Sequence, residues 1–214
     1  MEYDVVIVGA GPAGLTTAIK LKQLDPNLNV CILEKGSEVG AHILSGNVFE
    51  TKALDELIPN WKNEGAPVKT KVSKEKFLFL GKNSSLSWPT WLLPSVQKNH
   101  KNYIVSLANL CRWLAEQAEK LGVEIFPGFP ASEVLYNEDG SIKGVATLDM
   151  GLDKDGNKKD TYQEGMELHA KVTVFSEGCR GHLGKQLIKK FNLDKGKNPQ
   201  QYGIGLKEIW EVSE

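Results

Sequence analysis

The chain has 214 residues, of which 41% are hydrophobic and 25% charged, and its formal net charge is −1. This length allows one or two domains with a substantial core, and the near-neutral charge gives no sign of a nucleic-acid partner. The three cysteines are far apart and form no C-x-x-C pair, so the sequence predicts no disulfide framework, no metal or iron–sulfur site, and a reducing compartment. No apolar stretch approaches the ~20 residues that span a bilayer. The first predicted strand begins at residue 3, so we expect no signal or transit peptide.

The first 34 residues have the order of a dinucleotide-binding unit. Residues 3–8 (YDVVIV) predict a buried strand, and residues 9–14 (GAGPAG) form a G-x-G-x-x-G pattern that opens a predicted helix over residues 15–24. A second apolar strand, residues 29–33, leads directly to Glu34. Strand, glycine turn, helix, strand and acidic residue follow one another as a nucleotide site requires.

Each residue of the glycine turn has a physical role in this prediction. Gly9 allows a sharp turn out of the strand, Gly11 lets the backbone approach a pyrophosphate, and Gly14 lets the helix pack closely on the sheet. The helix that begins around Pro12 and Ala13 directs its N–H groups and the positive end of its dipole at the phosphates.

The end of the second strand and the loop after it carry further candidates. Glu34 is placed to accept hydrogen bonds from a ribose diol, and an acidic residue there favours FAD or NAD over NADP. Loops after such a strand lie near the cofactor, so Lys35, Gly40, Ser45 and Gly46 are candidates to face phosphate or flavin. A plain surface loop with turn glycines is the alternative.

The stretch from 73 to 101 interrupts the alternation of strands and helices. It follows a predicted short helix at 51–57, with Thr51 as the candidate N-cap, and a predicted strand at 68–72. It contains a predicted hairpin formed by residues 76–80 and 86–88. Its large apolar side chains, flanked by lysines, are Phe77, Phe79, Trp88, Trp91, Leu92 and Leu93. Two interpretations are open: the hairpin covers the core, or it presents an apolar face to a membrane interface.

Residues 104–121 predict an amphipathic helix, with leucines at helical spacing on its apolar face and Gln117 on its polar face. Gly122 ends this helix. Residues 123–126 predict a strand that runs parallel to the first two, because a helix separates it from its predecessor.

From residue 131 the hydrophobic period changes to two. Residues 131–136 and 142–148 predict a hairpin, and residues 166–174 predict one long strand. The acidic residues between 153 and 164 have part of the spacing of a calcium loop. Lys158 stands where such a loop needs glycine, and no helices flank it, so we predict a hairpin turn instead.

A second strand–glycine–helix pattern lies at residues 171–191, with a predicted strand over 171–175 and a predicted amphipathic helix over 182–191. Gly178 would allow close approach to a cofactor at the same sheet edge as the first turn. Arg180 and His182 have two interpretations, as partners of an anion or flavin and as solvated residues at the start of a helix. The last predicted strand, residues 202–212, is followed by nothing that could pair with it, so we expect a truncated chain.

The sequence resembles the electron transfer flavoprotein–ubiquinone oxidoreductase family, within the glutathione-reductase-like FAD superfamily. The resemblance covers essentially the whole chain. It rests on VIVGAGPAGL, which many flavoproteins share, and on four more particular segments: GAHILSGNVFE, NYIVSLANLCRWLAEQAEKLGVEIFPGFPASEVLY, GMELHAKVTVFSEGCRGHL and YGIGLKEIWEV.

The resemblance implies an electron-transferring-flavoprotein dehydrogenase. Such enzymes take electrons from reduced electron transfer flavoprotein and pass them through FAD and a [4Fe-4S] cluster to ubiquinone. The resemblance also implies a peripheral membrane protein, on the cytoplasmic face of a bacterial inner membrane or at the mitochondrial inner membrane. The hairpin over residues 76–94 would help form the quinone pocket and the membrane-facing patch.

The implied FAD contacts fall on both glycine turns. Ala131 would lie near the adenine, and Glu177 and Gly178 near the ribose and pyrophosphate. The ADP half of FAD would lie against Gly9, Gly11, Pro12, Ala13, Gly14 and Glu34. No catalytic side chain and no metal ligand is expected in this chain, because the flavin carries the chemistry.

The predicted fold is α/β. It consists of a Rossmann-like FAD-binding domain over residues 1–72 and 102–200, with a central parallel sheet and an antiparallel β-meander. The beginning of a truncated, β-rich quinone or substrate domain is expected over residues 73–101 and 201–214.

The departures from the family are as informative as the matches. Family members are more than twice as long, and this chain lacks the later motif for the ribityl-phosphate side of FAD and the four cluster cysteines. We therefore expect the [4Fe-4S] cluster only in the missing part, weak FAD binding by this chain alone and no activity with ubiquinone. The alternatives are a related FAD reductase or monooxygenase of the geranylgeranyl-reductase or FixC type, and a non-catalytic FAD-fold fragment.

Overall fold

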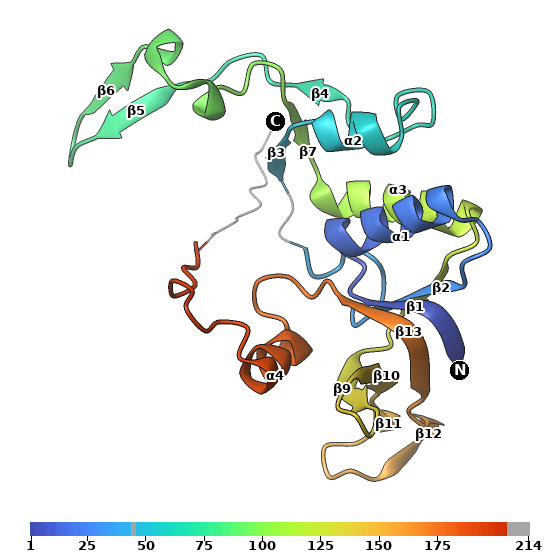
Figure 1. The fold of residues 1–214 in the computed structure, drawn as a ribbon. Coiled ribbons are helices and arrows are strands. Elements are labelled where there is room, and N and C mark those ends of the chain that lie inside the picture. Colours follow the sequence, from blue (N-terminus) through green and yellow to red (C-terminus); the bar gives the residue numbers. More distant parts are fainter. Residues whose placement is uncertain (44–45, 205–214) are drawn as a thin grey trace.

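The computed structural model describes residues 1–43 and 46–204. Its centre is a six-stranded sheet with the strand order β8-β2-β1-β13-β10-β9 (Figure 1). The first four strands in this order are parallel, and β10 and β9 are antiparallel to their neighbours. The strands are β1 (Glu2–Val8), β2 (Val30–Glu34), β8 (Glu124–Pro127), β9 (Ala131–Tyr136), β10 (Ile142–Thr147) and β13 (Glu167–Phe175).

Helices cover both faces of this sheet. Helices α1 (Pro12–Leu24) and α3 (Leu107–Lys120) pack side by side on one face, and α4 (His182–Phe191) packs on the other (Figure 1). Along β1, Val5 and Ile7 belong to the core under α1 and α3, whereas Val6 and Val8 belong to the core under α4. This alternation is the period of a strand buried on both faces, and it confirms the predicted α/β, Rossmann-like class.

The predicted helix over 104–121 is wrong at its start. Residues Tyr103–Val105 form strand β7, which lies between β3 (Asn47–Phe49) and β4 (Thr70–Lys71) in a small antiparallel sheet. Ile104 is exposed between two buried neighbours, so this short stretch has the period of a strand. The side chain of Ser106 then caps α3 by accepting a hydrogen bond from the backbone N–H of Asn109 at 3.4 Å.

Two further expectations need correction. Gln117, predicted on the polar face of α3, is buried, and its Oε1 accepts a hydrogen bond from Lys120 Nζ at 3.3 Å. Helix α2 (Lys52–Leu57) forms where predicted. However, the Thr51 hydroxyl donates to the Asp55 carboxylate at 2.8 Å instead of capping the helix backbone.

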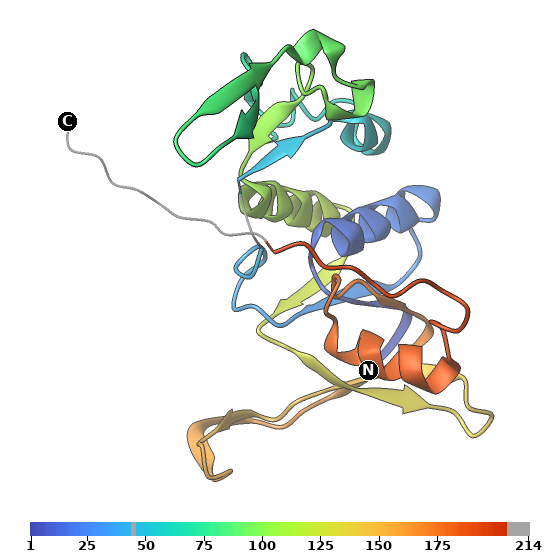
Figure 2. The same cartoon turned by 90° about the vertical axis from the view of Figure 1, so that its left-hand side faces the viewer.

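The hairpin of residues 76–94 extends away from the rest of the chain. In both views the six-stranded sheet and the hairpin lie on opposite sides of α1 and α3 (Figures 1 and 2). The two strands of the hairpin are β5 (Phe77–Leu80) and β6 (Ser85–Trp88). A short 3₁₀ turn at Thr90–Leu92 follows β6 within the same segment, and a second one at Ser95–Gln97 lies directly after it. Leu80 is 79% exposed and Trp91 is 73% exposed, so the hairpin does not cover the described core.

The β13 region matches the sequence predictions more closely. The hairpin turn predicted in place of a calcium loop is confirmed: it connects β11 (Met150–Leu152) to β12 (Lys158–Gln163). The Asp153 carboxylate there accepts hydrogen bonds from the backbone N–H groups of its own turn. Residues 202–204 have no strand structure, and the remainder of the predicted 202–212 strand lies outside the described residues.

Candidate dinucleotide-binding site

The first glycine turn connects β1 to α1 with no space for side chains at two of its three glycines. Gly9 has a φ of +103°, and a Cβ on it would lie 2.6 Å from the Ser176 carbonyl oxygen. A Cβ on Gly14 would lie 2.0 Å from the Gly9 carbonyl oxygen. Gly11 differs, since a Cβ there would meet no atom within 4 Å. Gly9 and Gly14 are therefore required by the protein's own packing, while Gly11 borders open space.

Helix α1 presents an open N-terminus at this turn. Gly11 is the N-cap residue with no side-chain hydrogen bond to the helix, Pro12 follows it, and the first helical turn contains no acidic residue. Backbone N–H groups and the positive end of the helix dipole favour an anion at such a position.

Glu34 lies at the same turn. Its Oε2 accepts a hydrogen bond from the backbone N–H of Ala10 at 2.9 Å, and its Oε1 accepts one from the N–H of Gly36 at 2.7 Å. The half-buried carboxylate therefore links the β1–α1 turn to the loop after β2. Because each carboxylate oxygen has two acceptor positions, hydroxyl groups of a ligand can still donate to Glu34.

The loop after β2 packs on the start of α3. Gly40 has a φ of +87°, and a Cβ on it would lie 2.8 Å from the Ala108 carbonyl oxygen, so its contact with α3 accounts for the glycine. Arg112 Nη2 and Glu38 Oε1 form an ion pair at 2.8 Å on the same side. Lys35 and Gly46 are exposed, and Ser45 lies outside the described residues.

The connection from β8 to β9 runs along the end of β2. The N–H of Gly128 donates to the Gly36 carbonyl at 2.7 Å, and the N–H of Phe129 donates to the Glu34 carbonyl at 3.0 Å. These bonds bring the start of β9, where Ala131 lies, to the edge that carries Glu34. Gly36 and Gly128 are not among the site residues predicted from the sequence. The spacing Glu34-x-Gly36 is the signal that could have identified the first, since a Cβ on Gly36 would lie 3.1 Å from Glu34 Oε1.

The second glycine turn meets the first directly. Val8 pairs with Leu33 on one side and Phe175 on the other, so three parallel strands end together. The N–H of Ser176 donates to the Val8 carbonyl at 2.8 Å. Gly178 has a φ of +77°, is exposed, and would place a Cβ in open space.

The polar side chains of the second turn have partners within the chain. Both carboxylate oxygens of Glu177 accept backbone hydrogen bonds from the start of α4. The Arg180 guanidinium lies 4.8 Å from the centre of the Tyr202 ring. His182 Nε2 is 3.4 Å from the side-chain nitrogen of Gln186. Both side chains are exposed, with His182 at the first position of α4 and Arg180 two residues before it.

The buried thiols of β2 and α3 are held in their protonated form. Burial raises the pKa of Cys31 on β2 to about 12, and the Glu124 carboxylate adds to the shift. Burial also raises the pKa of Cys111 on α3 to about 12, with a smaller contribution from Glu34. The first turn thus offers main-chain donors and the Glu34 side chain, which suits binding and orientation of a nucleotide.

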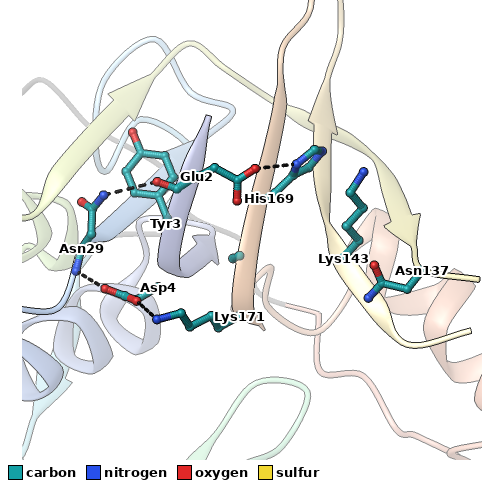
Figure 3. A pocket seen from close by; sticks show the side chains of 9 residues that line it. Glu2, Tyr3, Asp4, Asn29, Asn137, Lys143, His169 and Lys171 are labelled. Atoms are coloured by element: carbon teal, nitrogen blue, oxygen red, sulfur yellow. Dashed lines mark hydrogen bonds and ion pairs between the residues drawn. The ribbon is translucent and has the colours of Figure 1, made fainter. Parts of the chain in front are cut away.

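A concave surface of about 430 Å³ lies at the opposite end of the same strands (Figure 3). Four of its side chains form two pairs: Asp4 Oδ1 is 2.7 Å from Lys171 Nζ, and Glu2 Oε1 is 3.0 Å from His169 Nδ1. Because this surface is at the amino ends of β1 and β13, it is not part of the glycine-turn site.

Comparisons with known proteins show what the chain resembles. The sequence model of the Thi4 family matches residues 1–57. The chain is 57% identical over 218 residues to the probable electron transfer flavoprotein-ubiquinone oxidoreductase of Acinetobacter baylyi, covering 99% of this chain and 38% of that protein. It is 56% identical over 215 residues to the mitochondrial electron transfer flavoprotein-ubiquinone oxidoreductase of Dictyostelium discoideum, covering 99% of this chain and 35% of that protein.

The solved structures include THI4 of Thermovibrio ammonificans, with a TM-score of 0.56 and 18% sequence identity over 89% of this chain and 63% of that one. At this identity the likeness supports the fold alone. The chain spans little more than a third of the length of the curated relatives it matches. The resemblance predicted from the sequence is confirmed: over nearly its whole length, this chain is similar to part of the electron transfer flavoprotein-ubiquinone oxidoreductases.

Proposed function

We propose that this chain binds the ADP half of FAD at the carboxyl edge of β1, β2 and β13, as part of a flavin-dependent oxidoreductase. The observation that carries the proposal is the open N-terminus of α1 beside Gly11, with the Glu34 carboxylate tied to the same turn. An anionic diphosphate suits the first feature, and a ribose diol suits the second.

The residues present fit this half of the cofactor. Space in front of Gly11 and Gly178 admits a ligand next to the main chain. Bound FAD would supply the electron-accepting ring system, while the chain's residues bind and orient the nucleotide. The proposed contacts on the two turns and the adjoining loops are Gly9, Gly11, Pro12, Ala13, Gly14, Glu34, Lys35, Gly40, Ser45, Gly46, Ala131 and Gly178. Glu177 belongs to the same site as the neighbour of Gly178 on the second turn.

For the whole protein, we propose electron transfer from reduced electron transfer flavoprotein to ubiquinone. The names of the relatives support this proposal, and the partners come from those names. The [4Fe-4S] cluster has no support among the described residues, where no three His, Cys, Asp or Glu side chains gather into a metal site. We assign it to the part of the relatives that this chain does not span.

The hairpin of residues 76–94 is the proposed membrane contact, on the cytoplasmic face of a bacterial inner membrane or at the mitochondrial inner membrane. Among residues 1–43 and 46–204, no helix has the length and apolar character to cross a bilayer. The support comes from exposed side chains near Lys74, Lys76 and Lys82: Phe79, Leu80, Leu86, Trp88 and Trp91. Aromatic and basic residues together suit the boundary between headgroups and acyl chains.

The cofactor proposal is tested with Gly11→Ala. Its Cβ would lie within 4 Å of no atom in residues 1–43 and 46–204, so the variant should fold normally. It should nevertheless bind FAD at least about tenfold more weakly, because the methyl group occupies the diphosphate position. FAD fluorescence quenching measures the affinity, and thermal unfolding measures the fold. Gly203→Ala is the control, since that exposed site is also open. Equal FAD affinity in all three proteins would reject the proposed site.

The donor and membrane proposals have separate tests. A FAD-loaded sample should be bleached by reduced electron transfer flavoprotein and remain unchanged with NADH or NADPH, which a pyridine-nucleotide-dependent reductase would accept. For the membrane, Trp91→Ser should lower flotation with phosphatidylcholine vesicles, whereas Trp61→Phe, at a buried position, should not. Flotation that is unaffected by Trp91→Ser would argue against the hairpin as the contact.

A further inference from the structure

Two strand–glycine–helix turns reach the same sheet edge, but their helices begin differently. Among the residues that the structure describes, no side chain caps the N-terminus of α1. The N-terminus of α4 is closed by Glu177: Oε1 accepts from the N–H groups of His182 at 2.9 Å and Leu183 at 3.1 Å, and Oε2 accepts from Gly184 at 2.7 Å. One carboxylate thus satisfies three N–H groups and places a negative charge at the positive end of the α4 dipole.

The missing side chain at Gly181 leaves the space that this carboxylate occupies. A Cβ on Gly181 would lie 2.6 Å from the Glu177 Cβ and 2.7 Å from its Oε2. A Cβ on Gly184 would lie 3.5 Å from the same oxygen, which is ordinary contact. Gly181 therefore has to lack a side chain for Glu177 to fold back on α4, whereas Gly184 does not.

The second glycine turn, which contains Glu177, is in contact with the first glycine turn. Ser176, directly before Glu177, donates its N–H to Val8, and its carbonyl oxygen occupies the position that a Cβ on Gly9 would need. Gly178, directly after Glu177, faces open space with a positive φ. Fixing Glu177 to α4 therefore fixes the backbone that borders the first turn.

We propose that Glu177 is a positioning and specificity residue for the nucleotide, acting through the main chain of α4 and the Gly178 turn and not by touching the ligand. Its carboxylate keeps phosphate away from the start of α4, so the diphosphate binds at α1 alone. The same hydrogen bonds hold the Gly178 backbone where it borders the nucleotide. This inference rests on the proposed function, because it refines how that site selects the position of its anion.

The test compares Glu177→Ala, Glu177→Gln and Gly181→Ala with the wild-type chain, and Gly184→Ala is the matched control. The first readout is the thermal unfolding midpoint without FAD, in sodium sulfate and in sodium chloride at equal ionic strength. In Glu177→Ala the start of α4 loses its carboxylate, so sulfate should raise the midpoint more than it does in the wild type. Glu177→Gln retains one acceptor oxygen and should fold with an intermediate response.

The second readout is the dissociation constant for FAD. Glu177→Ala and Gly181→Ala should raise it roughly tenfold, and Gly184→Ala should leave it unchanged. Weaker FAD binding without any added effect of sulfate would overturn the proposal, since the residue would then only support the fold. Unchanged FAD affinity in Glu177→Ala would overturn it as well. If the wild type itself binds no FAD, the proposed function fails, and the sulfate measurement still decides whether Glu177 excludes anions from α4.

Discussion

The sheet under α1 and α3 and the hairpin of β5 and β6 are built from similar apolar residues in opposite surroundings. Ile7 in the sheet is fully buried, and Leu110 in α3 is 2% exposed, whereas Leu80 in the hairpin is 79% exposed and Leu86 is 65% exposed. The difference lies in what covers each strand. Helices cover both faces of β1, while β5 and β6 contact chiefly each other. Apolar content alone therefore does not indicate which region is the core.

The two regions also differ in what they can do. The sheet holds two glycine turns within hydrogen-bond distance of each other, and a site of that kind requires rigid support. The hairpin exposes a contiguous apolar surface that contributes little to the described core, so it is available for contact with another surface. Substitutions in the first region should change stability, and substitutions in the second should change association.

The largest expected effect is that of Leu110→Ala in the core between α1 and α3. Removing a side chain that is 2% exposed should lower the free energy of unfolding by about 3 kcal/mol, through lost burial and a residual cavity. Urea unfolding followed by circular dichroism measures this value. Leu121→Ala, at a position that is 40% exposed after the same helix, should cost well under half as much. Equal losses would mean that the core is not where the structure places it.

Gly14→Ala should have the next largest effect. Its Cβ would lie 2.0 Å from the Gly9 carbonyl oxygen, so the backbone has to shift, at a cost of about 2 kcal/mol. Thermal unfolding of this variant beside Gly11→Ala separates the two glycines, because Gly11 borders open space. A stable Gly14→Ala protein would contradict the close packing of α1 on the turn.

The buried Cys31 thiol makes the free energy of unfolding depend on pH in the alkaline range. The pKa of Cys31 is raised by burial from 9.0 to about 12, so above pH 9 the unfolded chain loses this proton while the folded chain retains it. Stability should therefore fall as pH rises from about 9 toward 12, and Cys31→Ala should make the slope shallower by about 1 kcal/mol per pH unit. Unfolding in urea at several pH values measures the slope. Cys179→Ala, at an exposed position, is the control and should leave it unchanged.

The smallest expected effect on stability belongs to the hairpin. Leu86→Ser replaces a side chain that is 65% exposed, and it should change the free energy of unfolding by less than about 0.5 kcal/mol. The thermal midpoint should be that of the wild type within experimental error. A large loss would show that the hairpin is part of the stabilising core, and the contrast between the two regions would disappear.

Local sequence determined the first turn and its surroundings. The apolar runs of residues 3–8 and 29–33, the G-x-G-x-x-G spacing and the acid at position 34 are features of neighbouring residues. The strands and the helix around them form where the pattern predicts. Helix α4 has the predicted bounds for the same reason, since its apolar spacing is regular and a glycine precedes it. Short elements were less predictable: Tyr103–Val105 is too brief to distinguish a strand from the first turn of the following helix.

Contacts between distant residues decided the rest. Gly40 packs against Ala108 of α3, which is far from it in the sequence. Glu177 accepts hydrogen bonds from backbone groups of α4, which begin five residues later. The exposure of the hairpin depends on which surfaces the helices cover, and the amino-acid sequence of the two strands does not determine this. The sequence by itself specified the unit that can hold a nucleotide. Only the tertiary structure placed a carboxylate at the second helix and left the first helix open, because hydrogen bonds and steric contacts depend on distance in space and not on separation along the chain.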